Sequence, residues 1–137
     1  MVRNTSTTQG VVALSSGESE FYSSVKAASI GLGLIALLRD MGVSIEKPVL
    51  LRMDATAGIG VASRQGAGCI RHICTPSLWL QGAVRDDRVR MRKVPGPENC
   101  ADVGKKHVDA ATLKKTLKAC GFVMLAGRSS MALKAAV

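Results

Sequence analysis

The segment that decides the fold is Pro48-Val-Leu-Leu-Arg-Met53, followed by Asp54-Ala-Thr-Ala-Gly-Ile59. A short, mostly apolar run that ends at an acidic residue is typical of a buried β-strand, so we expect a strand over residues 48–53. The small residues after it predict a short helix over residues 55–64, which Gly66 and Gly68 would end. A strand that leads directly into a helix indicates an α/β protein.

A second strand and two further helices are predicted downstream. Residues 88–94 (Arg-Val-Arg-Met-Arg-Lys-Val) alternate between basic and apolar side chains, the pattern of a half-exposed strand. Residues 71–84 carry apolar side chains at helical spacing, although Pro76 fits only near the start of a helix. A last helix is expected over residues 99–119, with a break, because Asn99 can cap its first turn.

Upstream of the first strand, residues 16–40 predict a long helix. Their apolar side chains recur at spacings of four and three, which favours a helix that buries one face. Ser15 and Glu18 have the spacing of a capping box at its start. Gly31 and Gly33 would each weaken this helix by about 1 kcal/mol relative to alanine, and we expect close packing at these positions as the reason for them.

Only three segments of the chain predict strands. The third is the short apolar run at residues 10–14, which follows a loose, polar segment at residues 1–9. Sheets usually contain about four to six strands, so the pattern indicates that part of a larger sheet is missing. With 137 residues, the chain fits one domain. We expect that domain over residues 10–122, followed by a patternless tail at residues 123–137.

The charge of the chain favours a polyanionic partner. Nineteen lysines and arginines oppose ten acidic residues, which gives a net charge of +9 at pH 7. Charge alone does not distinguish DNA, RNA, a hybrid or an anionic membrane. No apolar run reaches the roughly 18 residues of a membrane span and no secretory signal is recognisable, so an intracellular protein is expected, in the cytoplasm or nucleus. The four cysteines lack a C-x-x-C pair and are expected to be buried free thiols.

Three carboxylates stand at the boundaries of predicted elements. Glu20 lies one turn into the first helix, Asp54 directly follows the apolar strand, and Asp102 lies in the first turn of the last helix. Ligands collect at the carboxyl ends of strands in open α/β sheets, where converging carboxylates would suit Mg²⁺. The alternative is that each acid only caps a helix or complements its dipole.

The chain also resembles the ribonuclease H domain of copia-type retrotransposon Pol polyproteins. Motifs of that family occur in its order and at similar spacing over roughly residues 10–122. They are Val12-Ala-Leu-Ser-Ser-Gly-Glu-Ser-Glu-Phe-Tyr22, Arg52-Met-Asp-Ala-Thr-Ala-Gly-Ile59, Ile70-Arg-His-Ile73, Leu78-Trp-Leu80, Val94-Pro-Gly-Pro-Glu-Asn99 and Ala101-Asp102. The resemblance implies a ribonuclease H-like α/β fold. This copy would be truncated, lacking the first two strands and most of the third.

The resemblance implies a metal-dependent endonuclease. In the family two divalent ions, Mg²⁺ or Mn²⁺, support hydrolysis of the RNA strand of RNA–DNA hybrids. Glu20, Asp54 and Asp102 match three of the four carboxylates that hold these ions and are the expected catalytic and metal-binding residues. The fourth is an Asp on the family's first strand, which bridges both ions, and residues 1–11 contain no acid. We therefore expect a weak or incomplete metal site and impaired hydrolysis.

Seven residues are candidate contacts to nucleic acid: Arg71, His72, Arg88, Arg90, Arg92, Lys105 and Lys106. An equally good interpretation of the basic strand at residues 88–94 is that its arginines form a solvated face, which only keeps the strand edge from pairing with another chain. His72 could instead support helix packing. His107 lies five residues after Asp102. In some ribonucleases H a histidine near the last catalytic Asp assists product release, and the resemblance implies this role for His107 as one alternative.

The expected partners are an RNA–DNA hybrid or other nucleic acid, and the reverse transcriptase part of the polyprotein, with no membrane. Two other functions remain open from the sequence. The chain could be a non-catalytic, basic nucleic-acid-binding remnant, or an inert pseudogene fragment that never folds stably.

Overall fold

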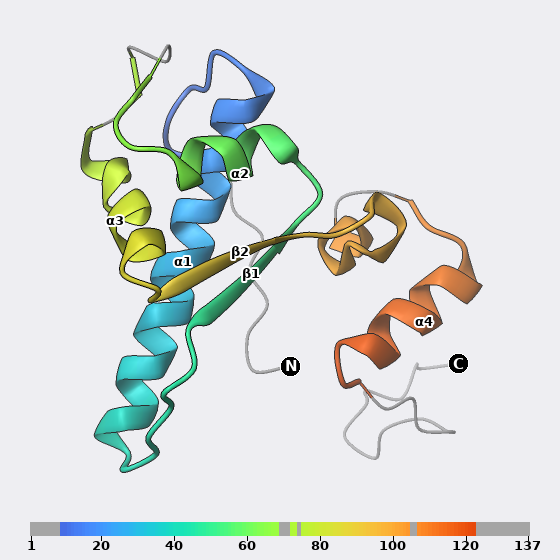
Figure 1. Ribbon diagram of the computed structural model, residues 1–137. Coiled ribbons are helices and arrows are strands. Elements are labelled where there is room, and N and C mark those ends of the chain that lie inside the picture. Colours follow the sequence, from blue (N-terminus) through green and yellow to red (C-terminus); the bar gives the residue numbers. More distant parts are fainter. Residues whose placement is uncertain (1–8, 69–71, 74, 105–106, 123–137) are drawn as a thin grey trace, which may run out of the picture. The chain divides into compact units, whose positions relative to one another are not determined.

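The protein is a mixed α/β chain with four α-helices and a two-stranded parallel sheet among the residues that the structure describes (Figure 1). The computed structural model describes residues 9–68, 72–73, 75–104 and 107–122. Contacts divide the chain into two units, of which the first spans Thr7–Asn99 and the second begins at Cys100. The prediction of one domain over residues 10–122 stays a prediction.

Helix α1 spans Ser16–Asp40 and confirms the predicted long helix. Ser15 caps it, since the Ser15 Oγ accepts a hydrogen bond from the Glu18 N–H at 3.2 Å. The Glu18 carboxylate accepts from the N–H of Leu14 at 2.9 Å rather than from Ser15, so the capping box is displaced by one residue. Gly42 adopts a φ of 82° just beyond the helix, the left-handed conformation that ends many helices at a glycine.

Strands β1 (Val49–Met53) and β2 (Val89–Lys93) pair in parallel, with Val49 opposite Val89 and Met53 opposite Lys93. Both predicted strands are thus confirmed. The strand predicted at residues 10–14 is wrong, because that segment forms bends and has no described strand beside it. An isolated extended segment has no partner for its backbone groups and does not form a strand.

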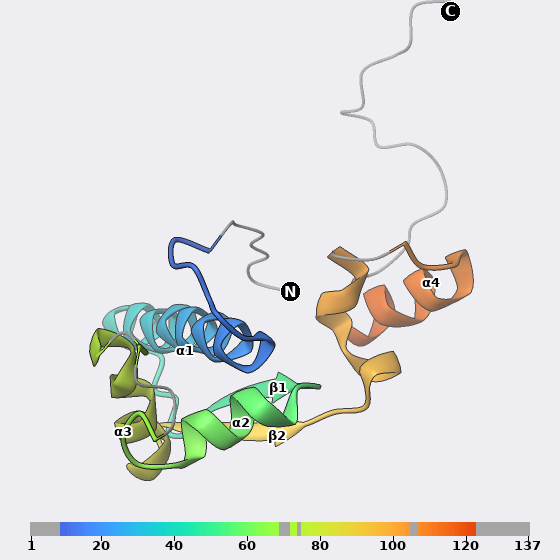
Figure 2. The same ribbon diagram turned by 90° about the horizontal axis from the view of Figure 1, so that it is seen from above.

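Three helices of the first unit, α1, α2 (Thr56–Ser63) and α3 (Trp79–Arg85), pack with the strands (Figure 1). Seen from above, α1 lies along one side of the sheet (Figure 2). The core between these elements contains Phe21, Tyr22, Ala28, Val61, Ala62, Ile73, Leu80, Ala83 and Val89. The strand side chains that pack against this core belong to alternate residues, so the residues between them lie on the opposite, open face of the sheet.

Two predicted helices are shorter in the structure than in the sequence analysis. Within residues 71–84, the described residues 72 and 73 form a turn and a bend, a 3₁₀ turn follows at Thr75–Leu78, and α3 begins only at Trp79. Pro76 explains this start, since a proline is tolerated in a first turn but not inside a helix.

In the second unit, the predicted helix over residues 99–119 is divided. It comprises a 3₁₀ segment at Cys100–Gly104 and helix α4 at Ala110–Ala119. Asp109 is the N-cap of α4, because its carboxylate accepts hydrogen bonds from the N–H groups of Ala111 and Thr112. The expected break is thus confirmed, and it creates a new N-cap.

Helix α1 is also long and apolar enough to cross a membrane by length and composition. The same criterion is met by core helices of soluble proteins, and α1 places Phe21 and Ala28 in the core without solvent exposure. The expectation that the chain has no membrane span therefore stays a prediction.

The two glycines in the middle of α1 differ in their surroundings. A Cβ at Gly31 would lie 2.7 Å from the Cγ1 of Val49, whereas a Cβ at Gly33 would meet nothing within 4 Å. Close packing against β1 thus explains Gly31 but not Gly33.

We predict that alanine stabilises the protein at Gly33 but not at Gly31. Gly33→Ala should raise the free energy of unfolding by about 1 kcal/mol through helix propensity. The Gly31→Ala variant should have a free energy of unfolding about 1–3 kcal/mol lower than the Gly33→Ala variant, because the added methyl group overpacks Val49. Urea denaturation of the full chain measures both. Equal stabilisation by the two substitutions would contradict the packing of α1 on β1.

Candidate functional site

Two of the three predicted catalytic carboxylates lie at the carboxyl end of β1. Asp54 directly follows the strand, and Glu20 lies on α1. Gly58 of helix α2 packs against both α1 and β1, because a Cβ there would lie 3.1 Å from the Cβ of Glu20 and 3.0 Å from the Cε of Met53. Since Glu20 and Met53 contact the same glycine, the structure brings Glu20 to the strand end that carries Asp54. Both side chains are partly exposed.

Asp102 belongs to the second unit, in the 3₁₀ segment at Cys100–Gly104, where it is half-buried. His107 lies in the same unit and is exposed. Within the described ranges, no three His, Cys, Asp or Glu side chains lie close enough together to hold a metal ion. Carboxylate oxygens suit Mg²⁺, so Glu20 and Asp54 are chemically fit to bind one such ion. The three-carboxylate site itself stays a prediction.

The most buried carboxylate of the first unit is Glu18, which is only 1% exposed. Its Oε2 lies 2.9 Å from the Nε2 of His72, whose side chain is 48% exposed. The Leu14 N–H foremost, and then His72 and Tyr22, hold the pKa of Glu18 below its ordinary value of 4.5, against the opposing effect of burial. His72 therefore contacts a buried carboxylate of α1. This contact agrees with the alternative in which His72 supports helix packing.

The open face of the sheet is basic. The parallel register places Arg52 on β1 beside Arg92 on β2, and Leu50 beside Arg90. All four side chains are exposed. Like charges on directly opposite strand residues repel each other, so an anion bound between Arg52 and Arg92 would stabilise the pair. Arg52 was not predicted as a contact, although it is the one charged residue of the apolar run at residues 48–53, between the half-buried Leu51 and the buried Met53.

The remaining predicted nucleic-acid contacts differ in their surroundings. Arg88 and Arg92 are exposed, whereas both ends of the Arg90 guanidinium donate to Asp87, at 2.6 Å each. This ion pair raises the pKa of Arg90 and lowers that of Asp87. Arg71, Lys105 and Lys106 lie outside the described residues.

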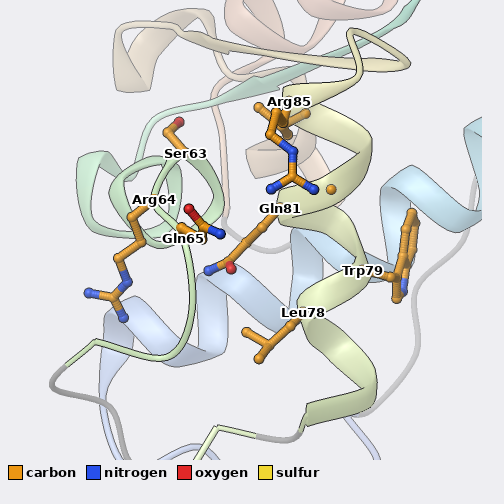
Figure 3. A pocket seen from close by; sticks show the side chains of 9 residues that line it. Ser63, Arg64, Gln65, Leu78, Trp79, Gln81 and Arg85 are labelled. Atoms are coloured by element: carbon orange, nitrogen blue, oxygen red, sulfur yellow. The ribbon is translucent and has the colours of Figure 1, made fainter.

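An open pocket of about 560 Å³ lies between α2 and α3 (Figure 3). Its polar side chains mainly fix the loop between the helices. Gln81 accepts from the Gly66 N–H and donates to the carbonyl oxygens of Val61 and Gly66, while Arg64 donates to Ala67. Arg64 and Arg85 extend from different walls and do not converge in Figure 3. The pocket therefore lacks the convergent polar groups typical of a ligand site.

The second unit brings two thiols together. Cys100 and Cys120 are free, as expected, but half-buried rather than buried, and burial together with the neighbouring Cys100 thiol raises the pKa of Cys120. Cys69 and Cys74 lie outside the described residues.

The lowered pKa of Glu18 predicts a pH-dependent stability. The unfolded carboxyl group takes up a proton more readily than the folded one, so the contribution of Glu18 is fully present above about pH 4.5 and is lost as the pH falls through the folded pKa. Glu18→Gln should flatten the stability curve in this acidic window. Glu46→Gln, an exposed substitution of the same type before β1, is the matched control. Thermal melts at a series of pH values measure both, and identical curves for the two variants would contradict this role of Glu18.

The comparisons with known proteins identify no relative. No family model matches the chain, no curated protein matches it, and no solved structure matches it.

Proposed function

We propose that the chain is a ribonuclease H-like domain of a copia-type retrotransposon polyprotein, which binds RNA–DNA hybrids through the open face of its sheet. The observation that carries the proposal is the pairing of Arg52 with Arg92 on that face. Asp54 directly follows the same strand β1, and Gly58 of α2 packs against both Glu20 and the last strand residue, Met53. A phosphate-binding surface and a carboxylate site on one strand are what a nuclease of nucleic acid duplexes requires.

The binding part of the proposal depends on charge. Arg52 and Arg92 are exposed, and the nearby Arg88 adds a third guanidinium at the start of β2. Guanidinium groups bind phosphates with two parallel hydrogen bonds, and each phosphate that is neutralised releases counterions. Contacts of this kind position a duplex without reading its sequence, so hybrid and duplex DNA should both bind.

The hydrolytic part depends on Glu20, Asp54 and Asp102. These side chains would hold divalent ions, and such ions supply an activated water and charge stabilisation at the scissile phosphate when bound. The family's bridging Asp has no counterpart in residues 1–11, which lack acidic side chains. Two closely spaced cations repel each other strongly, and without the bridging Asp the other three carboxylates do not compensate this repulsion sufficiently. We infer that the 137-residue chain, tested by itself, binds hybrid without hydrolysing it efficiently.

A non-catalytic nucleic-acid-binding domain is the second candidate. The bidentate pair of Arg90 with Asp87 favours it, because this contact orders the basic strand without involving any carboxylate of the predicted metal site. The two candidates share the binding surface and differ in cleavage. The third alternative, an inert fragment, predicts no cooperative unfolding transition.

We predict that hybrid binding depends on Arg52 and Arg92. Arg52→Gln/Arg92→Gln should weaken binding at low salt and reduce the slope of log K against log salt by about 2, since two phosphate contacts are lost. Arg39→Gln/Arg85→Gln removes the same charge from exposed helix ends and is the control. Fluorescence anisotropy with a labelled hybrid measures the slopes, and equal slopes for the two double variants would contradict the open-face assignment.

We predict that cleavage needs a fourth carboxylate. The 137-residue chain should cleave a hybrid in Mg²⁺ or Mn²⁺ no faster than its Glu20→Gln/Asp54→Asn variant. Prefixing a family first strand with its Asp should restore cleavage that depends on Glu20, Asp54 and Asp102. A gel assay with a labelled RNA strand measures this. Metal-dependent cleavage by the unextended chain, abolished by Asp54→Asn, would show that three carboxylates suffice.

A further inference from the structure

Two cysteine side chains meet inside the second unit. Cys100 begins the 3₁₀ segment at Cys100–Gly104, and Cys120 is the C-cap of helix α4. The segment and the helix pack against each other (Figure 1). The thiols of the two residues hydrogen-bond each other. The fold therefore brings two sulfur atoms from distant parts of the sequence into contact.

The end of α4 fixes the position of Cys120. The Gly121 N–H donates to the Lys118 carbonyl at 3.0 Å. The Phe122 N–H donates to the Leu117 carbonyl at 2.9 Å, which completes the two hydrogen bonds of a Schellman motif. Gly121 has the φ of 79° that this motif requires. A helix end closed in this way leaves the Cys120 backbone little freedom, so its sulfur stays beside the partner thiol.

Two thiols in contact can form a disulfide or help to hold a metal ion. A structural zinc ion needs four ligands, and among the residues that the structure describes no group of three His, Cys, Asp or Glu side chains is placed to hold a metal. A disulfide needs only the two sulfur atoms, which small side-chain rotations bring to the bond length of about 2 Å. Both side chains are half-buried, so a small oxidant reaches them. The geometry thus favours the disulfide.

We propose that Cys100 and Cys120 form a reversible disulfide when the protein meets a peroxide. The order of the two thiols follows from the surroundings of Cys120. Burial and the hydrogen bond to Cys100 raise the pKa of Cys120, so Cys120 keeps its proton and the attack on the oxidant falls to Cys100. The reaction involves neither the sheet nor nucleic acid, and it therefore goes beyond the proposed function.

One molecule of hydrogen peroxide completes the reaction. The Cys100 sulfur attacks a peroxide oxygen, so an S–O bond forms, the O–O bond breaks, and the leaving hydroxide takes the thiol proton as water. The Cys120 sulfur then attacks the Cys100 sulfur. The S–S bond forms, the S–O bond breaks, and a second hydroxide leaves with the Cys120 proton as water. The two thiols lose two electrons, which the peroxide gains, and a thiol reductant reverses the change.

The disulfide would join the 3₁₀ segment that carries Asp102 to the end of α4. It would close the chain between residues 100 and 120 and so reduce the conformational entropy of the unfolded second unit. Oxidation would therefore stabilise this unit in a way that a reductant removes.

The test treats the reduced full chain with hydrogen peroxide, alkylates the remaining thiols and maps the products by mass spectrometry without reduction. We expect a peptide pair that joins Cys100 to Cys120, with the loss of two hydrogen atoms, and its disappearance in dithiothreitol. Cys100→Ser or Cys120→Ser should abolish this pair, whereas the control Cys69→Ser/Cys74→Ser should change its yield less than threefold. In a glutathione redox buffer, the ratio of disulfide to dithiol in the control variant should be at least tenfold higher in the folded chain than in urea, because the fold holds the sulfur atoms together.

Three results would overturn the proposal. A ratio that urea does not lower would show that the fold does not bring the two sulfur atoms together. Cys100 linked to Cys69 or Cys74 as often as to Cys120 would contradict a specific pair. Protection of both thiols from alkylation by equimolar Zn²⁺, with no disulfide after peroxide, would assign the pair to a metal site.

Discussion

The parallel pairing of β1 with β2 is the constraint on which the rest of the first unit depends. Its register fixes which side chains of both strands face the helices and which face outward, because the period along a strand is two. A slip by one residue would turn Leu51 outward and Arg52 into the core. Burial of Val89 without solvent exposure opposes that slip, and it thereby holds the arginines on the open face.

Glycines set how closely the helices approach this sheet. Gly31 admits the side chain of Val49, and Gly58 admits both Glu20 and Met53. These contacts place a helix carboxylate near the end of β1, where a second carboxylate follows at Asp54. The candidate site is therefore a consequence of close packing between α1, α2 and β1 rather than of any single motif.

The sequence predicted the regular elements of this unit well, and for physical reasons. Helix α1 has a side-chain cap and a regular apolar stripe, and β2 has strict alternation, so local chemistry alone specifies them. The strand predicted at residues 10–14 failed because strand formation needs a neighbour, which local sequence does not reveal. The start of α3 at Trp79 was predicted too early, because a 3₁₀ turn at Thr75–Leu78 that contains Pro76 precedes the helix.

The candidate site was predicted less completely, because its contacts join distant residues. Glu18 and His72 are 54 positions apart, and only the fold brings the buried carboxylate to the histidine. Arg52 escaped notice because a five-residue strand with two exposed positions shows little periodicity until its partner strand is known. Glu20 and Asp54 were predicted from their positions at element boundaries, and their role in a site stays a prediction. Asp102 belongs to the other unit, so its part in the site stays a prediction.

The central claim is that the open face of the sheet is the surface that contacts nucleic acid. A ¹⁵N NMR titration of the full chain with an RNA–DNA hybrid tests it most directly, because the amide and Nε resonances report on each arginine separately. The account predicts that the largest shifts occur at Arg52 and Arg92, with small shifts at Arg64 and Arg85 beside the pocket between α2 and α3. Shifts centred on Arg64 and Arg85, with Arg52 and Arg92 unchanged, would contradict it.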